Sequence, residues 1–264
     1  GEYVLGEPLT LTAEDSGPAP SAPVVYLAEP AGRVVFSGGR RISGWKPAKL
    51  GGRDVWAAEV PAARASAPGA WRFRDLYVGG ERRTLARHPD TGFQKLQDVP
   101  DAPGEWWLDT AAGVRFYAPM PGENLDSLDA VAPRLDSLLL VRGDAQGGGP
   151  GRSVSNIRFE GITFAHAHWW FPDDFSLPGI PPGVHGFQQA AWGVPAAVRL
   201  EHATGISFDR CAVEHVSGAG LELGRADPLG QRDDQQRDDQ QAQAAGQGRG
   251  ERRAGQRRGG GRGG

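Results

Sequence analysis

The chain has 264 residues, enough for one large β domain or two small domains. Its net charge of −3 gives no field that favours nucleic acid, and no apolar run approaches the ~20 residues of a membrane span, so we expect neither nucleic-acid binding nor membrane insertion. The single cysteine, Cys211, excludes a disulfide framework and a thiolate metal cluster, and its apolar neighbours favour a place in the core.

Short strands separated by turns are predicted for residues 1–43, where apolar runs such as 24–27 lie between Gly, Pro, Asp and Asn. Residues 44–130 are denser in aromatic side chains. Apolar and polar residues alternate in 72–78 and 114–117, which predicts a small antiparallel β domain. With 21 prolines and 40 glycines, the chain leaves little room for a capped helix. The predicted fold class is all-β.

An internal repeat marks residues 131–224. Five positions recur at an offset of 49 residues: Ile157, Phe159, Ile162, Phe164 and His166 match Ile206, Phe208, Cys211, Val213 and His215. A second match, at an offset of 23, pairs Val198 and Leu200 with Leu221 and Leu223. A period near 23 residues is the length of one coil of a parallel β-helix, in which equivalent residues stack as ladders. The difference of 26 residues between the two offsets predicts one long inserted loop, at about 169–195.

The segment 225–264 has a different composition. Leu229 is its only large apolar residue, so it cannot bury enough surface to offset the entropy of ordering, and we expect a disordered tail. Its Arg-, Gly- and Gln-rich composition, starting where a third coil is due, is what a shifted reading frame in a GC-rich gene would produce; a genuine linker is the alternative. The segment has nine Arg, six acidic residues and no aromatic residue, which is too weak a pattern for nucleic-acid binding.

Several phrases of the chain resemble one family of known proteins, the right-handed parallel β-helix proteins related to glycoside hydrolase family 141. The phrases are residues 1–17, 36–45, 73–89, 103–123 and 156–164. In combination they resemble the family's opening coil, its exit into an inserted β domain, phrases of that insert, and its return to the helix. The resemblance covers about 1–224.

This resemblance implies a right-handed parallel β-helix in residues 1–43 and 131–224, interrupted by an inserted β domain in 44–130. It also implies a secreted bacterial protein acting on plant-type polysaccharide, with α-L-fucosidase and xylanase activities among relatives. Members have more sequence before Gly1 and many more coils after Leu223, so we expect a fragment truncated at both ends. The acidic catalytic residues are expected in the missing coils, and no catalytic residue is assigned here.

Glycoside hydrolysis needs two carboxyl groups roughly 5–10 Å apart, one of them with a raised pKa. The candidates in this chain are Asp173, Asp174, Glu201, Asp209, Glu214 and Glu222. The last four occupy outward positions beside inward apolar residues, which favours a structural role. Asp173 and Asp174 lie on the long loop, where binding residues concentrate, and are the better candidates for contacting a substrate.

His166 and His215 occupy equivalent positions on two coils, so we expect their rings to stack about one strand spacing apart, ~4.8 Å. They either contact sugar hydroxyls or transfer protons, or they are turn residues bonded to the backbone. His168 and His202 lie nearby, but no ligand spacing is diagnostic, and we expect no metal and no cofactor.

Aromatic residues begin the predicted loop, among them Trp169 and Trp170. Flat rings suit sugar rings, although most of these side chains are expected to anchor the loop to the helix. In the Trp106–Trp107 pair, a strand with two faces places at least one ring in a core.

The sequence therefore predicts part of a secreted, cell-surface or periplasmic glycoside hydrolase that binds polysaccharide or oligosaccharide and is inactive as this chain. The rival hypothesis is a non-catalytic carbohydrate-binding or surface-adhesion protein. A lyase is a third, favoured if activity required Ca²⁺ and a basic residue. Because the last coil has no successor, we also expect self-association through the open end of the helix.

Overall fold

The computed structural model describes residues 1–30, 32, 34–67, 69–88, 96–97, 99–144, 153–169 and 194–224. This part of the chain is all-β, as predicted, with three single-turn 3₁₀ helices: η1 (Ala13–Asp15), η2 (Pro61–Ala63) and η3 (Leu125–Ser127). Within it, no helix is long and apolar enough to cross a membrane. The predicted tail at 225–264, and all of the predicted loop except 169, 194 and 195, lie outside the described residues.

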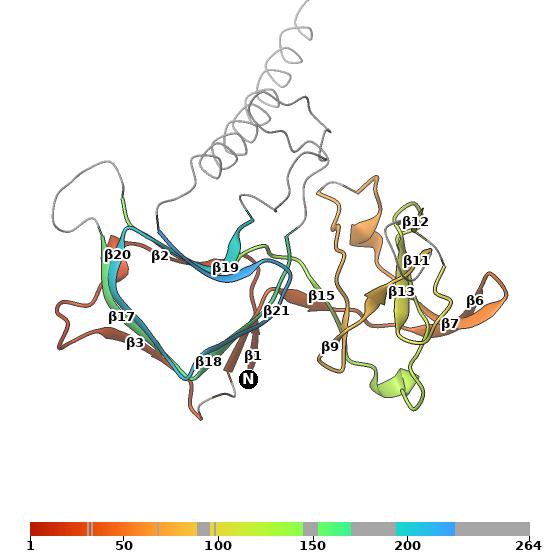
Figure 1. The fold of residues 1–264 in the computed structure, drawn as a ribbon, viewed down its shortest axis with the longest axis horizontal. Coiled ribbons are helices and arrows are strands. Elements are labelled where there is room, and N and C mark those ends of the chain that lie inside the picture. The colour runs from red at the N-terminus through yellow and green to blue at the C-terminus, as the bar shows by residue number, and fades with distance from the viewer. Residues whose placement is uncertain are drawn as a thin grey trace, which may run out of the picture. The chain divides into compact units, whose positions relative to one another are not determined.

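Three parallel sheets share one core (Figure 1). Sheet 1 contains β1 (Glu2–Val4), β4 (Val34–Ser37), β18 (Ile162–Ala167) and β21 (Ala212–Val216). Sheet 2 contains β2 (Leu9–Leu11), β16 (Leu139–Arg142), β19 (Ala196–Glu201) and β22 (Ala219–Leu223). Sheet 3 contains β3 (Val24–Leu27), β17 (Val154–Glu160) and β20 (Ala203–Asp209). The chain visits sheets 1, 2 and 3 in this order three times, adding one strand to each sheet at every passage, and then adds β21 to sheet 1 and β22 to sheet 2.

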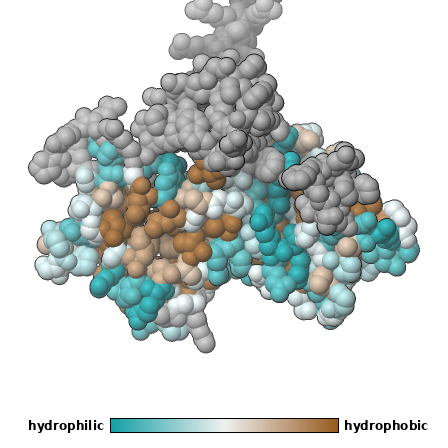
Figure 2. Space-filling view, in the orientation of Figure 1, coloured by the Kyte–Doolittle hydropathy of each residue, from teal (hydrophilic) through white to brown (hydrophobic). Residues whose placement is uncertain are grey.

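The register of these sheets confirms the spacing of the sequence repeat. Phe159 is aligned with Phe208, and Val198 with Leu221, at the two predicted offsets. Phe159 also stacks on Tyr26, with ring centroids 5.1 Å apart, and its centroid lies 5.0 Å from that of Phe208. Apolar side chains of like position thus form continuous ladders, and each fully buried one contributes roughly 1.5–3 kcal/mol of burial free energy. Figure 2 shows apolar side chains gathered over the area that β19, β20 and β21 enclose in Figure 1.

Residues with positive φ recur at equivalent positions of neighbouring strands and turns. Asn156 and Gly205 both have positive φ, at 57° and 64°, and so do Gly161 and Arg210, at 69° and 52°. Asn tolerates the left-handed conformation better than most residues do. Here the Asn156 amide donates to the carbonyl of Gly17, which is distant in the chain, at 3.0 Å. Gly17 must be a glycine, since a Cβ there would lie 2.5 Å from the Asn156 carbonyl oxygen.

Between Ser37 and Leu139 the chain builds further sheets. A five-stranded sheet has the order β10 (Thr84–Leu85), β13 (Glu105–Asp109), β14 (Val114–Tyr117), β7 (Arg53–Glu59) and β6 (Lys46–Leu50). A four-stranded sheet has the order β5 (Gly39–Arg41), β15 (Ala130–Pro133), β8 (Tyr77–Val78) and β9 (Glu81–Arg82), and β11 (Arg87–His88) pairs with β12 (Leu96–Gln97). All of these pairs are antiparallel except β10 with β13.

These sheets have an apolar core of their own. Trp106 is fully buried and Trp107 is half-buried, which confirms that one ring of the pair lies in a core. The Arg115 guanidinium is also fully buried, 3.9 Å from the ring centroid of Phe73 and 4.3 Å from that of Trp106. Its nitrogens have no hydrogen-bond partner within the described structure, and burial lowers its pKa. Stacking on two ring faces is therefore what compensates this charge.

One predicted strand is wrong in its extent. The alternating pattern of 72–78 predicts a continuous strand, whereas only Tyr77–Val78 joins a sheet. Phe73 and Leu76 enter the core of the inserted sheets, while Asp75 contacts His168 beside sheet 1. The side chains of this segment thus contact both the inserted sheets and sheet 1. Its residues 72–76 pair with no strand in the described structure.

Candidate functional site

The predicted stacking of His166 and His215 is present in sheet 1. Their ring centroids lie 4.9 Å apart with an interplanar angle of 21°. Both residues have positive φ, at 64° and 53°, and the pairing of β18 with β21 skips them, running from Ala165 with Glu214 to Ala167 with Val216. The repeat therefore places one irregular residue at the same point of two adjacent strands, and their side chains form a pair.

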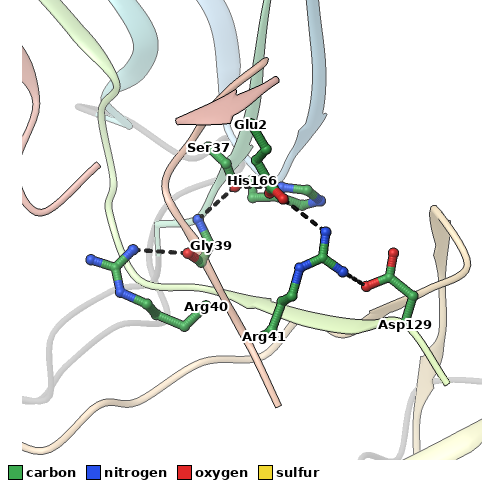
Figure 3. Close-up of polar contacts among 7 residues, drawn as sticks. All are labelled: Glu2, Ser37, Gly39, Arg40, Arg41, Asp129 and His166. Carbon is green, nitrogen blue, oxygen red and sulfur yellow. Dashed lines mark hydrogen bonds and ion pairs between the residues drawn. The ribbon is translucent and has the colours of Figure 1, made fainter. Parts of the chain in front are cut away.

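His166 is held by a polar network (Figure 3). Its Nδ1 lies 3.0 Å from Ser37 Oγ, which accepts from the backbone N–H of Gly39 at 3.3 Å. A Cβ on Gly39 would lie 3.0 Å from the Cβ of His166, so β5 reaches the ring only because this residue is glycine. Arg41 joins the network by donating to Glu2 at 2.8 Å and pairing with Asp129.

These surroundings set the charge of His166. Burial, then the nearby His215 and Arg41, lower its pKa to about 4, against the opposing effect of Glu2. The ring is therefore neutral near pH 7, and only a small fraction carries the second proton that a general acid must give. This geometry favours hydrogen bonding over proton transfer for His166. The Nδ1 contact is to a side-chain hydroxyl and not, as one sequence interpretation held, to the backbone.

Tyr77 of β8 completes an aromatic cluster with the two histidines. Its ring centroid lies 5.3 Å from that of His166, edge to face, and 4.7 Å from that of His215. Burial first, and then the charge of Asp75, raise the pKa of Tyr77 to about 12, so the phenol is neutral. Two members of the cluster, Tyr77 and His166, are therefore uncharged around pH 7.

A second polar group lies at the end of β18. His168 Nδ1 is 2.5 Å from Oδ2 of the buried Asp75 and 3.2 Å from Ser217 Oγ, and Arg82 pairs with the other oxygen of Asp75. Burial raises the pKa of Asp75, but the hydrogen bond and charge of His168 and then the charge of Arg82 outweigh it, so that the pKa is lowered. The ionised carboxylate fixes the proton of His168 on Nδ1.

This group is not a nucleophilic triad, because Ser217 and Asp75 contact the same imidazole nitrogen. It leaves His168 Nε2 pointing away from both. Nε2 of His168 and Nδ1 of His215 are buried and have no hydrogen-bond partner among the described residues. A buried polar atom in this condition costs roughly 1–3 kcal/mol, so each needs an explanation.

The remaining predicted site residues are only partly described. Trp169 is half-buried, and its backbone N–H donates to Ser217 Oγ at 3.1 Å. Trp170, Asp173 and Asp174 lie outside the described residues. In the described ranges, no group of three or more His, Cys, Asp or Glu side chains is arranged to hold a metal.

Comparisons with known proteins place this geometry in context. Neither a family model nor a curated protein matches the chain. A solved structure described as "Glycoside hydrolase" is similar to 82% of this chain and 53% of its own, with a TM-score of 0.58 and 22% identity. The chain has a glycoside hydrolase-like fold. It spans about half the length of that structure.

A second solved structure, "The complex structure of XylC with xylose", matches 81% of this chain and 35% of its own. Its TM-score of 0.42, at 17% identity, is too low to support an argument. The likeness to the first structure shows the fold, and the chemistry has to come from the side chains.

On this glycoside hydrolase-like fold, most of the candidate carboxyl groups that the structure describes are held in ion pairs. Glu201 is buried, 3.0 Å from Arg142 and 3.1 Å from Arg199, which also pairs with Glu222. Asp209 pairs with Arg210, and Glu214 is exposed on β21. Glu105 is the one described carboxyl group whose pKa is raised, and it accepts from the backbone N–H groups of two neighbours.

The sequence interpretation missed Asp75, Tyr77, Ser37 and Ser217 as members of the site. Asp75 and His168 are 93 residues apart in the chain, and no local pattern connects them. The available signal was the charged pair Arg74–Asp75 in the otherwise aromatic and apolar stretch 73–78. The histidine pair was found because it repeats.

Proposed function

We propose that this chain is part of a secreted glycoside hydrolase of the right-handed parallel β-helix type, related to glycoside hydrolase family 141, that degrades polysaccharide. The passage of the chain through three parallel sheets in constant order supports a solenoid of coils in 1–43 and 131–224, with an inserted domain in 44–130. The likeness to a structure about twice as long supports a larger parent protein. We propose a cell-surface or periplasmic location, where polysaccharide is encountered.

Two unpartnered imidazole nitrogens carry the proposal. His168 Nε2 and His215 Nδ1 lack partners within the described structure, and the ring of His215 lies beside the flat ring of Tyr77. A sugar hydroxyl both donates and accepts hydrogen bonds, so it can pair with an imidazole nitrogen whether or not that nitrogen carries a proton. Sugar rings also present apolar faces that pack on aromatic rings. A wall of histidine and tyrosine therefore suits an oligosaccharide.

In this proposal His166, His215 and Tyr77 form the wall, and Asp75 positions His168. Trp169, Trp170, Asp173 and Asp174 contribute from the predicted loop, a role that rests on the sequence alone. Hydrolysis is assigned to a carboxyl pair in the parent protein outside this chain.

A non-catalytic carbohydrate-binding protein is the second candidate function. It is favoured by one observation: most of the described candidate carboxylates are held in ion pairs with arginine. None of these is set up as the general acid that glycoside hydrolysis requires. The test must therefore separate sugar binding from bond cleavage.

The test is calorimetric titration of the chain with xylan- and fucose-containing oligosaccharides, combined with an assay for released reducing ends. We expect weak, millimolar binding and no cleavage by this chain. His215→Asn, which keeps a residue tolerant of positive φ, should weaken binding by about tenfold, a loss of about 1.4 kcal/mol. His202→Asn is the matched control, because His202 also has positive φ. Absence of binding, or equal affinities of the two variants, would contradict the proposal. If the parent protein binds oligosaccharide without cleaving it and has no suitably spaced carboxyl pair, the non-catalytic binding protein is favoured instead.

A further inference from the structure

His166 lies on β18 and His168 directly after it, and each has its Nδ1 within hydrogen-bonding distance of a side-chain oxygen. A neutral imidazole has one N–H group, which donates, and one bare nitrogen, which accepts. An oxygen partner that takes a hydrogen from Nδ1 therefore leaves Nε2 as the acceptor. The two oxygen partners thus decide which ligand groups the rings can bind.

Asp75 makes His168 an acceptor at Nε2. Burial opposes ionisation of Asp75, but His168 and Arg82 outweigh it and lower its pKa, so the carboxylate can only accept hydrogen bonds near pH 7. The proton between Oδ2 of Asp75 and Nδ1 of His168, which lie 2.5 Å apart, therefore belongs to Nδ1. In the neutral ring Nε2 then carries a lone pair, and this nitrogen is buried without a hydrogen-bond partner among the described residues.

A serine relays the same effect to His166. Burial opposes ionisation of Glu2, but neighbouring groups, among them the hydroxyl of Ser37, lower its pKa, so this carboxylate takes the one hydrogen of that hydroxyl. The Ser37 oxygen can then only accept, from the backbone N–H of Gly39 at 3.3 Å and from Nδ1 of His166 at 3.0 Å (Figure 3). The bare nitrogen of this ring is again Nε2.

We infer that the site selects neutral glycosyl units over uronic acids, an inference that rests on the proposed sugar binding. Two imidazole acceptors require ligand groups that donate, and a sugar hydroxyl donates. A carboxylate brings only lone pairs, so it would leave the buried Nε2 of His168 without a hydrogen. Asp75 and Ser37 are positioning residues, because they act on the ligand only through the imidazole rings.

The arginines in this network are already paired with carboxylates. Arg82 pairs with Asp75, and Arg41 pairs with Glu2 and with Asp129. Arginine is the side chain whose geometry best matches a carboxylate. A uronic acid would therefore have to compete with carboxylates of the chain itself for these two guanidinium groups, whereas a neutral sugar would not.

Long-range ¹H–¹⁵N spectra of the unliganded chain at pH 7 test the direction of these hydrogen bonds. Such spectra distinguish the two neutral tautomers and the doubly protonated ring. We expect the proton on Nδ1 in both His166 and His168. A proton on Nε2 of His168 overturns the inference, whether or not sugar binds.

Two serine variants provide a matched comparison in the same spectra. Ser37→Ala removes the acceptor of His166, so the proton of that ring should redistribute between its two nitrogens. Ser217→Ala is the control, because Ser217 also lies 3.2 Å from Nδ1 of His168, where Asp75 holds the proton, and the tautomer of His168 should not change. An unchanged His166 in Ser37→Ala would overturn the role of Ser37.

Calorimetric titration with three tetrasaccharides of the same linkage tests the selectivity. The probes are xylotetraose, cellotetraose, and the form of cellotetraose whose hydroxymethyl groups are oxidised to carboxylates. We expect the oxidised form to bind about tenfold or more weakly than the better neutral probe. Equal affinities would overturn the selectivity and leave sugar binding standing, whereas no binding of any probe would overturn both.

Discussion

At the scale of single residues, two contacts build the polar cluster beside sheet 1: the stacked rings of His166 and His215, and the pair of His168 with Asp75. The pairing of His166 with His215 was predictable because the pattern of β18 recurs in β21 at an offset of 49 residues, and the two strands lie side by side. Asp75 was not, since its partner His168 lies on a distant strand and only the folded chain brings them to 2.5 Å. A repeat in the sequence therefore predicts the histidine pair, whereas the contact of Asp75 with His168 depends on packing between distant segments.

Removing the charge of Asp75 should destabilise the chain strongly. Asp75→Asn leaves the shape but takes the buried anion from between His168 and Arg82, and we expect a loss of roughly 3–5 kcal/mol in the free energy of unfolding. Asp129→Asn is the control, because the pair of Asp129 with Arg41 is half-exposed and worth at most ~1 kcal/mol. Urea denaturation at pH 7 measures both, and equal losses would show that the buried pair has no special weight.

The depressed pKa of His166 predicts a pH dependence of stability. The folded chain binds the proton at about pH 4, whereas an unfolded histidine binds it near pH 6.5. In this window the unfolded state holds more protons, so the contribution is fully present above pH 6.5 and is lost as the pH falls towards 4.

His166→Asn removes this contribution and keeps a residue suited to positive φ. The variant should lose less stability between pH 7 and pH 5 than the wild-type chain does, as measured by urea denaturation at both values. The lowered pKa values of Glu2 and Asp75 also reduce stability on acidification, and they do so in the variant as well. Identical pH slopes would contradict the assignment.

At the scale of elements, the strands of sheets 1 to 3 were predictable because each needs only a local alternation and a like neighbour. The run predicted at 24–27 coincides with β3. The segment 72–76 was mispredicted as strand because its alternation serves two different neighbours, which a period cannot reveal.

Among the three stacked aromatic residues of sheet 3, we expect the central one, Phe159, to stabilise the chain most. Phe159 is fully buried between Tyr26 and Phe208, so Phe159→Ala should cost roughly 3–5 kcal/mol of unfolding free energy. Phe208→Ala, on the half-buried edge strand, removes the same atoms and should cost clearly less. Denaturation midpoints that shift equally would mean that the edge strand is as well packed as the centre.

At the scale of the whole molecule, the fold and the proposed function rest on different kinds of observation. Composition and periodicity predicted the all-β class and the register, and the structure confirms both. Of the predicted sugar-binding residues, the structure brings together the repeating pair His166 and His215, and the segment 73–82 adds Asp75, Tyr77 and Arg82 to the cluster. The glycoside hydrolase-like fold supplies the scaffold, and the two unpartnered imidazole nitrogens supply the argument for a hydroxyl-rich ligand.

The central claim is that the histidine cluster binds sugar, and long-range ¹H–¹⁵N spectra of the histidine rings test it most directly. During titration with a plant-type oligosaccharide, the Nε2 resonance of His168 and the Nδ1 resonance of His215 should shift saturably together. The ring resonances of His202, at the corner between β19 and β20, should stay in place. Saturable binding that leaves His168 and His215 unchanged would contradict the account.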